Sequence, residues 1–202
     1  FALAHNGNLV NSGQLKRWLE DHGSLFHSTS DSEILAHLIK KENDSRKRIF
    51  HIIDALNMIE GAFAFLIMTG SKLYAARDKH GLRPLSLGRL NGGYVLSSET
   101  CAFDVIGAEF IRDIEPGEVV TISEDGIESN NYSMYKRNFM CAMEYIYFAR
   151  PDSDIEGTNV HAFRKESGKL LWKEAPVEAD IVIGVPDSSL SAAIGYSEAS
   201  GI

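Results

Sequence analysis

Apolar residues in the first sixty positions recur at the intervals that place side chains on one face of a helix. This pattern predicts a helix over 12–22, with Gly23 as its stop. A second helix is predicted after Ser30-x-x-Glu33, which matches a capping box, and a third over 46–60. The early part of the chain is therefore expected to be mainly helical after one short apolar strand.

The hydrophobic period changes after residue 61. The nearly continuous apolar run over 62–68 predicts a strand that is buried on both faces, and 72–76 predicts the next strand. Shorter strands, separated by glycine-containing turn signals, are predicted over 84–89, 93–98, 109–113, 118–123 and 126–129. A block of helices followed by a block of short antiparallel strands favours a layered α+β fold over alternating βαβ units.

The pattern changes again near residue 130. A polar, loop-like stretch over 130–138 precedes a predicted helix over 159–173. A continuous apolar run over 179–185 then predicts a buried strand, and a helix is predicted over 189–199 after a short loop. This order of strand, loop and helix indicates the beginning of an α/β domain.

Composition narrows the choice of partners. The 202 residues carry a net charge of −8, which argues against nucleic acid or an anionic membrane surface as the main partner. No apolar run reaches the length of a membrane span, and the two cysteines indicate a reducing, cytoplasmic setting. Because the chain starts on an apolar, strand-like segment and stops just after a predicted helix, we expect it to be an internal piece of a longer protein.

The first candidate site combines Asn6, Gly7 and Asp31. A side-chain amide and a backbone N–H that point to one place have the donor geometry of an oxyanion hole. The alternative for Asn6-Gly7 is a type I′ hairpin turn. Asp31 is interpreted either as a helix N-terminal residue that satisfies free N–H groups or as a carboxylate that binds a ligand ammonium group.

Two loops are weaker candidates. Arg77-Asp78, followed by a glycine and a proline, is interpreted mainly as a salt-bridged structural corner. The loop over 184–189, between a predicted strand and a predicted helix, has the position of a phosphate-binding loop but lacks Walker glycine spacing. The histidines show no metal-ligand spacing, and no nucleophile with a matching base is visible.

Taken together, the motifs occur in the order found in one family of enzymes. They are Ala4–Asn11, Thr29–Glu33, Arg77-Asp78, Gly81-x-Arg83-Pro84-Leu85, Ser97-Ser98-Glu99, Pro116-Gly117-Glu118, Glu144–Ser153 and Val185-Pro186-Asp187-Ser188. Over essentially its whole length the chain resembles the glutamine phosphoribosylpyrophosphate amidotransferases (amidophosphoribosyltransferases), which act in purine synthesis. The segment Glu144–Ser153 is the most discriminating motif.

The resemblance implies a fold and a division into domains. Residues 1–135 would form an incomplete class II glutamine amidotransferase (glutaminase) domain, an α+β, N-terminal-nucleophile αββα sandwich. Residues 136–202 would form an interdomain segment and the beginning of an α/β phosphoribosyltransferase domain. In this family a processed N-terminal Cys attacks the glutamine amide and its own α-amino group is the base. Such chemistry needs no triad, which fits the lack of one here.

The resemblance also implies roles for individual residues. The Asn6 side chain and the Gly7 N–H would hold the oxyanion, and Asp31, with Ser30 beside it, would bind the substrate glutamine through its α-ammonium group.

Ser188 would lie at the magnesium and phosphoribosylpyrophosphate site, although helix capping by Ser188 or Ser189 is an alternative. Cys141 aligns with a ligand of a [4Fe–4S] cluster in some members, and the alternative is a half-buried free thiol. Cys101 is expected to pack in the core.

The implied reaction transfers glutamine-derived ammonia to phosphoribosylpyrophosphate and gives 5-phosphoribosylamine. A cytoplasmic homotetramer inhibited by purine nucleotides is the implied form. Two alternatives remain open: another class II glutamine amidotransferase, such as a hexosephosphate aminotransferase or asparagine synthetase, and a non-catalytic regulatory module that binds glutamine or a nucleotide.

Overall fold

The structure is a computed structural model that describes residues 1–41, 45–134 and 137–202. The chain forms two units, the first made of 1–85 and 114–140 and the second of 86–113 and 141–202. The boundary expected between residues 135 and 136 falls on positions outside the described residues.

Unit 1 contains a five-stranded antiparallel sheet with the strand order β1-β2-β3-β7-β8. Its strands are β1 (Ala2–Leu9), β2 (Gly61–Met68), β3 (Leu73–Arg77), β7 (Glu118–Ser123) and β8 (Gly126–Asn131). The apolar run predicted as a buried strand is β2, which lies between β1 and β3. Because β1 has only one neighbour, its other edge is not covered by this sheet.

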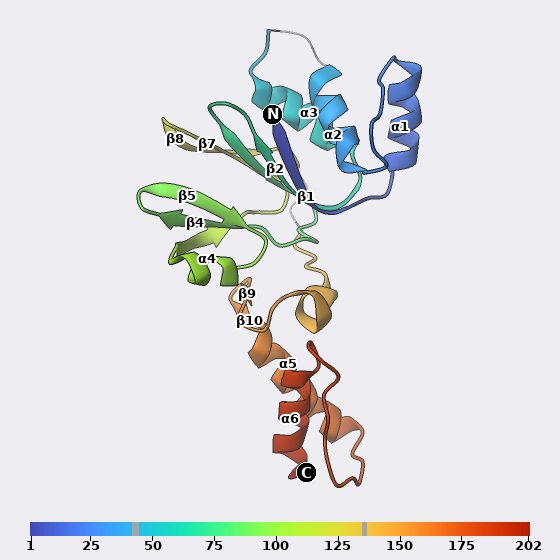
Figure 1. Cartoon of the computed structure of the whole chain (residues 1–202), viewed down its shortest axis with the longest axis vertical. Helices are drawn as coiled ribbons and strands as arrows, with labels where there is room; N and C mark the ends of the chain where they lie inside the picture. Colours follow the sequence, from blue (N-terminus) through green and yellow to red (C-terminus); the bar gives the residue numbers. More distant parts are fainter. Residues whose placement is uncertain (42–44, 135–136) are drawn as a thin grey trace. The chain divides into compact units, whose positions relative to one another are not determined.

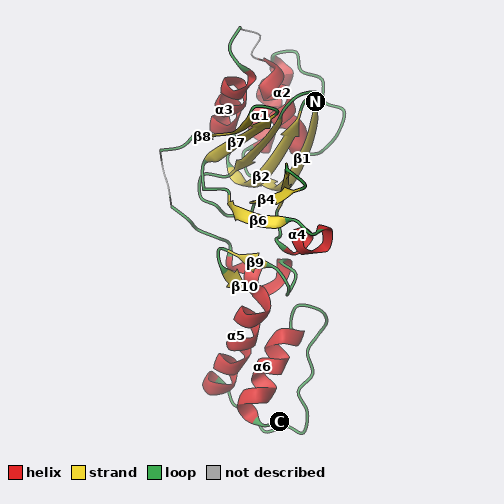
Figure 2. Cartoon of the chain, turned by 90° about the vertical axis from the view of Figure 1, so that its left-hand side faces the viewer, coloured by secondary structure: helices red, strands yellow, loops and turns green. Residues whose placement is uncertain are grey.

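Three helices cover one face of this sheet, as Figures 1 and 2 show. They are α1 (Ser12–Asp21), α2 (Ser32–Lys41) and α3 (Arg48–Met58). The core between helices and sheet is built from the apolar positions of both, including Leu19, Leu35, Ile52, Leu56, Phe63, Phe65, Ile67 and Tyr74. The helices predicted from periodicity are confirmed, and each buries most of the apolar residues of one face, although Trp18 of α1 is exposed.

The start of α2 differs from the predicted capping box. Glu33 reaches further back than Ser30, because its carboxylate accepts hydrogen bonds from the His27 N–H (2.8 Å) and the Ser28 N–H (2.8 Å). The Ser30 hydroxyl instead accepts from the Ser32 N–H at 3.3 Å. The loop before α2 therefore uses Glu33 to satisfy its own backbone donors.

Unit 2 begins with a three-stranded sheet of order β5-β4-β6. Its strands are β4 (Ser86–Leu90), β5 (Gly93–Ser97) and β6 (Glu109–Asp113), and the short helix α4 (Cys101–Ile106) follows β5. Asn91 and Gly92, both with positive φ, form the two-residue turn between β4 and β5, as the sequence predicted. Helix α4 was not predicted.

The remainder of unit 2 consists of a π-helical turn, η1 (Glu144–Phe148), the short pair β9 (Asp154–Ile155) and β10 (Thr158–Asn159), and two helices, α5 (Val160–Glu174) and α6 (Leu190–Ser200). A Cβ on Gly168 would collide with the backbone of α6, and one on Gly195 with the backbone of α5. These two glycines let the predicted helices pack closely. The η1 turn was not predicted.

The buried strand predicted over 179–185 is wrong. This segment has no regular secondary structure, and Ile181, Ile183 and Val185 are 68, 78 and 77% exposed. A strand needs a neighbour for its backbone groups, and no strand pairs with this segment among the described residues. Over those same residues, no helix is long and apolar enough to cross a membrane.

Candidate functional site

The Asn6-Gly7 pair lies inside strand β1, so the hairpin alternative for this pair is wrong. Gly7 pairs with Phe63 of β2 and has a φ of 151°. A Cβ at this position would collide with the carbonyl oxygen of Ala62. Gly7 is therefore required by the close approach of the two strand backbones.

The edge toward which the Gly7 N–H points follows from the ladder. The Val10 N–H donates to the Glu60 carbonyl at 2.8 Å, so the N–H groups of the even-numbered residues along β1 point toward β2. The Leu9 N–H donates instead to Oδ2 of Asp31, also at 2.8 Å. Since successive N–H groups of a strand alternate in direction, the Gly7 N–H points to the same free edge as the Asp31 carboxylate.

His5 is a third residue at this edge, and no role was predicted for it. Its Nδ1 lies 3.4 Å from Oδ1 of Asp31 and 2.9 Å from Oγ of Ser32, at the start of α2. The imidazole stacks on Phe65 with ring centroids 4.1 Å apart. His5 therefore joins β1 to the first turn of α2 and gives Asp31 a second polar neighbour.

The surroundings of His5 favour its neutral form. Burial lowers the pKa of the imidazole below 6.5, the positive charge of Arg83 lowers it further, and Asp31 opposes the shift. Nε2 of His5 is buried and has no hydrogen-bond partner among the described residues. A charged imidazole would be costly in this place.

The Arg77-Asp78 pair forms a structural corner through bonds to backbone groups, whereas the salt bridge expected at this corner stays a prediction. Asp78 is fully buried, and its carboxylate accepts from the backbone N–H groups of Phe63, His80, Leu82 and Arg83. The Arg77 guanidinium donates to the carbonyls of Gly81, Arg83 and Ile114. These bonds fix the loop after β3 and leave neither side chain open to solvent.

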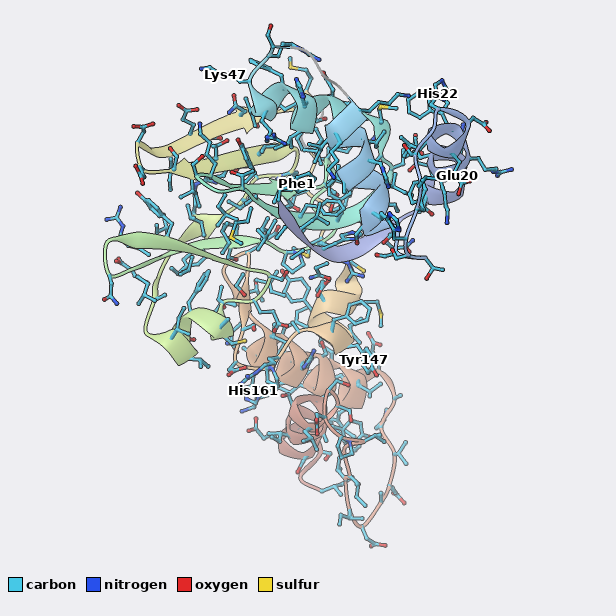
Figure 3. All side chains as sticks on the ribbon, turned by 45° about the horizontal axis from the view of Figure 1, so that its top comes forward. Phe1, Glu20, His22, Lys47, Tyr147 and His161 are labelled. Carbon is cyan, nitrogen blue, oxygen red and sulfur yellow. The ribbon has the colours of Figure 1, made fainter. Side chains whose placement is uncertain are left out.

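Ser188 lies in unit 2, in the turn before α6. With Asp187, Tyr147, Arg150 and Arg164 it lines a cavity of about 410 Å³. Figure 3 shows Tyr147 on η1, with its side chain exposed. The alternative of helix capping by Ser189 is not formed, because its hydroxyl donates to the Val185 carbonyl and makes no cap bond.

The two cysteines have different surroundings. Cys101 is 5% exposed, with Sγ 3.8 Å from Oε2 of Glu99, so the expected core packing is confirmed. Cys141 is half-buried and lies just before η1. In the part of the chain that the structure describes, no three His, Cys, Asp or Glu side chains are arranged to hold a metal ion.

One contact between two of the sequence motifs was not predicted. Glu99, from the Ser-Ser-Glu motif, accepts hydrogen bonds from the backbone N–H of Arg150 and the hydroxyl of Ser153. Both partners lie in the segment Glu144–Ser153. A half-buried carboxylate is stabilised by donors of this kind, but no local pattern says which residues supply them.

Comparison with known proteins gives consistent matches. The family model described as a glutamine amidotransferase domain matches residues 1–105. Amidophosphoribosyltransferase from Bacillus subtilis (strain 168) is 56% identical over 201 residues, which are 100% of this chain and 42% of that protein. The enzyme of the same name from Staphylococcus aureus (strain MRSA252) is 51% identical over 203 residues, covering 99% of this chain and 40% of that protein.

The fold matches solved structures equally well. The glutamine phosphoribosylpyrophosphate amidotransferase of B. subtilis, in complex with ADP and GMP, superposes with a TM-score of 0.96 and 56% identity, over 100% of this chain and 44% of that one. A structure described as the allosteric regulatory enzyme of purine biosynthesis gives the same TM-score and identity, over 43% of its chain. This chain thus spans less than half the length of these relatives.

These matches agree with the geometry at the free edge of β1. The resemblance to amidophosphoribosyltransferases is confirmed, and so is the predicted α+β fold of the N-terminal-nucleophile class. The family model covers more than half of the chain and includes Asn6, Gly7, Asp31 and Glu99. The chain therefore belongs to the family of glutamine amidotransferase domains.

Proposed function

We propose that the chain is part of an amidophosphoribosyltransferase. The observation that carries the proposal is the free edge of β1, where the Gly7 N–H and the Asp31 carboxylate face the same side and Asn6 is adjacent. The 56% identity to the B. subtilis enzyme over the whole chain supports it.

The first half-reaction is glutamine hydrolysis. A cysteine thiol, supplied upstream in the longer protein, attacks the amide carbon and forms a tetrahedral oxyanion. The Asn6 amide and the Gly7 N–H donate to this oxyanion as its charge develops. Asp31 binds the α-ammonium group of the substrate glutamine, with Ser30 beside it. The α-amino group of the same cysteine takes the thiol proton and returns it to the amide nitrogen, so that the tetrahedral species expels ammonia. Water then releases glutamate from the thioester.

The second half-reaction uses that ammonia. Its lone pair attacks C1 of phosphoribosylpyrophosphate, the bond to pyrophosphate breaks, and 5-phosphoribosylamine forms. Mg²⁺ would supply charge neutralisation on the pyrophosphate leaving group. The Ser188 hydroxyl and the Asp187 carboxylate, which line one cavity, are the oxygen ligands that Mg²⁺ prefers. These two side chains therefore fit a magnesium site that the substrate itself helps to complete.

A [4Fe–4S] cluster needs four thiolates. Of the two cysteines here, Cys101 is buried beside Glu99, and only Cys141 has an accessible position. We propose Cys141 as one ligand, with three further thiolates from the longer protein. Assays of iron and acid-labile sulfide on the full-length protein, with and without Cys141→Ser, test this assignment.

We propose a cytoplasmic homotetramer that binds purine nucleotides. The support for nucleotide binding is the complex of the B. subtilis relative with ADP and GMP. Sedimentation of the full-length protein, with and without these nucleotides, measures its oligomeric state and detects nucleotide that sediments with it.

The decisive experiment measures phosphoribosylamine and glutamate formed by the full-length protein from glutamine and phosphoribosylpyrophosphate. We expect Asn6→Ala to reduce glutamine-dependent turnover by about 10²–10³-fold, while synthesis from added ammonia persists. An Asn6→Ala enzyme with full glutamine-dependent turnover would contradict the assignment. Tight binding of glutamine or nucleotide without turnover would instead support the regulatory-module alternative.

A further inference from the structure

Two motifs far apart in the sequence meet at a single carboxylate oxygen in unit 2. Oε2 of Glu99 accepts hydrogen bonds from the Arg150 N–H (2.8 Å) and from the Ser153 hydroxyl (2.8 Å). Ser153 is fully buried, so its hydroxyl depends on this carboxylate for a partner. A half-buried carboxylate that accepts hydrogen bonds from two donors makes strong, charge-assisted hydrogen bonds.

The neighbouring residue repeats the connection. The Thr100 hydroxyl accepts from the Asp154 N–H at 2.7 Å and donates to the Asp154 carbonyl at 3.2 Å. Glu99 and Thr100 thus make four hydrogen bonds to the loop over 150–154 from the junction of β5 and α4. We name these two residues the Glu99–Thr100 clamp.

The clamped loop in turn holds the start of α5. The Ser153 carbonyl accepts from the Val160 N–H at 3.0 Å, and the Pro151 carbonyl accepts from the His161 N–H at 2.9 Å. Figure 3 labels His161 at this end of the helix. The position of the first turn of α5 therefore depends on the loop, and the position of the loop depends on the clamp.

The clamp joins a segment inside the glutamine amidotransferase match to one outside it. Glu99 lies within residues 1–105, which match the domain family, whereas Ser153 lies well beyond them. Both nevertheless belong to the same compact unit. Within unit 2, Glu99 thus holds a segment that lies beyond the residues matched by the family model.

We propose that Glu99 is a positioning residue that couples the two half-reactions. This inference rests on the proposed function. Glu99 is not assigned a contact with either substrate; it holds the loop over 150–154 and the start of α5 in the arrangement in which released ammonia is used instead of being lost to solvent. Removing the carboxylate leaves the Ser153 hydroxyl and the Arg150 N–H without their acceptor and releases the loop.

The test measures three rates in the full-length protein: glutamine hydrolysis, synthesis of phosphoribosylamine from added ammonia, and its synthesis from glutamine. The coupling ratio is the phosphoribosylamine formed per glutamine hydrolysed. For Glu99→Ala we expect this ratio to fall by about tenfold, the factor that corresponds to one lost hydrogen bond to a charged group. Glutamine hydrolysis should stay close to wild type, and synthesis from added ammonia should fall less than synthesis from glutamine, because Arg150 of the clamped loop also lines the Ser188 cavity.

Matched variants separate this role from general damage. Glu99→Gln keeps an oxygen acceptor and should lie closer to wild type than Glu99→Ala. Glu109→Ala removes an exposed carboxylate from β6 of the same unit and should leave the ratio unchanged. Should Glu99→Ala fail to fold, Ser153→Ala, which removes one of the two donors, is expected to lower the same ratio by a smaller factor.

Two results distinguish failure of this proposal from failure of the proposed function. Equal loss of all three rates, or an unchanged coupling ratio in folded Glu99→Ala or Ser153→Ala, overturns the proposal alone. A wild-type protein that forms no phosphoribosylamine from either nitrogen source overturns the proposed function, and the coupling role with it. Faster hydrogen exchange at the Val160 and His161 amides of Glu99→Ala is the expected structural readout.

Discussion

Nδ1 of His5 lies 3.4 Å from Oδ1 of Asp31, so a side chain of β1 fixes the carboxylate at the start of α2. The Leu9 N–H holds the other oxygen of the same carboxylate. Asp31 is therefore oriented from two positions of one strand, on either side of Gly7. This arrangement explains how a residue more than twenty positions away in the sequence reaches the free edge of β1.

Replacing His5 should weaken glutamine binding. His5→Phe keeps a ring to stack on Phe65 but removes the Nδ1 contact with Asp31. We expect the KM for glutamine to rise by about three- to tenfold, the effect of one net hydrogen bond, with a smaller change in kcat. His22→Phe, at the exposed end of α1, is the control and should leave KM unchanged. A KM that does not move in His5→Phe would show that Asp31 is held by Leu9 alone.

His5 should also give the protein an acid-sensitive stability. The folded-state pKa of His5 lies below 6.5, so the unfolded chain takes up a proton at a higher pH than the folded chain. The stabilisation is complete above pH 6.5 and is lost as the pH falls from 6.5 toward the lowered pKa. The thermal midpoint of wild type should fall relative to that of His5→Phe as the pH drops through this range; parallel curves would contradict the assignment.

Glu33 should give the stability of the protein a pH dependence at lower pH than His5 does. Hydrogen bonds from the His27 N–H, and then from Ser28, lower the pKa of this carboxyl to about 2. Its stabilisation is therefore present above the unfolded pKa of about 4.5 and is lost as the pH falls from there to about 2. Wild type should melt above Glu33→Gln at pH 7, and the difference should vanish near pH 2. Glu20→Gln on α1 is the control and should show no such convergence.

Replacement by alanine should destabilise the protein at Gly7 and stabilise it at Gly13. Gly7→Ala places a Cβ against the Ala62 carbonyl, at a φ that L-residues rarely adopt, and should cost at least about 2 kcal/mol in urea unfolding. Gly13 lies in α1 with open space around it, and Gly13→Ala should stabilise by about 0.5–1 kcal/mol. Equal effects would mean that the approach of β1 to β2 is not tight.

Replacing Asp78 by alanine should destabilise the fold far more than replacing an exposed aspartate. Asp78→Ala removes the acceptor of several buried backbone N–H groups and should cost at least about 3 kcal/mol of unfolding free energy. Asp54→Ala breaks a surface pair with Arg46, 2.8 Å long, and should cost less than about 1 kcal/mol. Denaturant titration of both variants measures the contrast, and a small loss in Asp78→Ala would contradict the structural role of the corner.

Local pattern was sufficient for most of the secondary structure. Helices α1, α2, α3, α5 and α6 and strands β1 to β8 follow from apolar spacing and turn residues, because the spacing of apolar residues that lets an element bury one face is a local property of the sequence. Helix α4 is short and bounded by packing against its sheet, so its six residues carry little periodic signal. The run over 179–185 has the composition of a strand but no partner strand among the described residues.

Sequence pattern alone predicted less of the candidate site. The motifs named Asn6, Gly7 and Asp31, but the roles of His5 and of the Glu99–Ser153 contact depend on pairings across many residues. Asp31 is oriented by hydrogen bonds from β1, and Glu99 by donors more than fifty positions later. Such partners are selected when the chain packs, because a half-buried carboxylate takes its donors from whichever segments the fold places beside it.

The two Asn-Gly pairs of this chain show how far local sequence determines backbone structure. At Asn91-Gly92 the sequence by itself determined the outcome: both residues have positive φ and form a two-residue hairpin turn. At Asn6-Gly7 the same dipeptide lies within a strand. There β2 pairs along the whole of β1, and the backbone of Ala62 approaches too closely for any residue but glycine. Only the tertiary structure decided this second outcome, because pairing with a distant strand outweighs the turn preference of two residues.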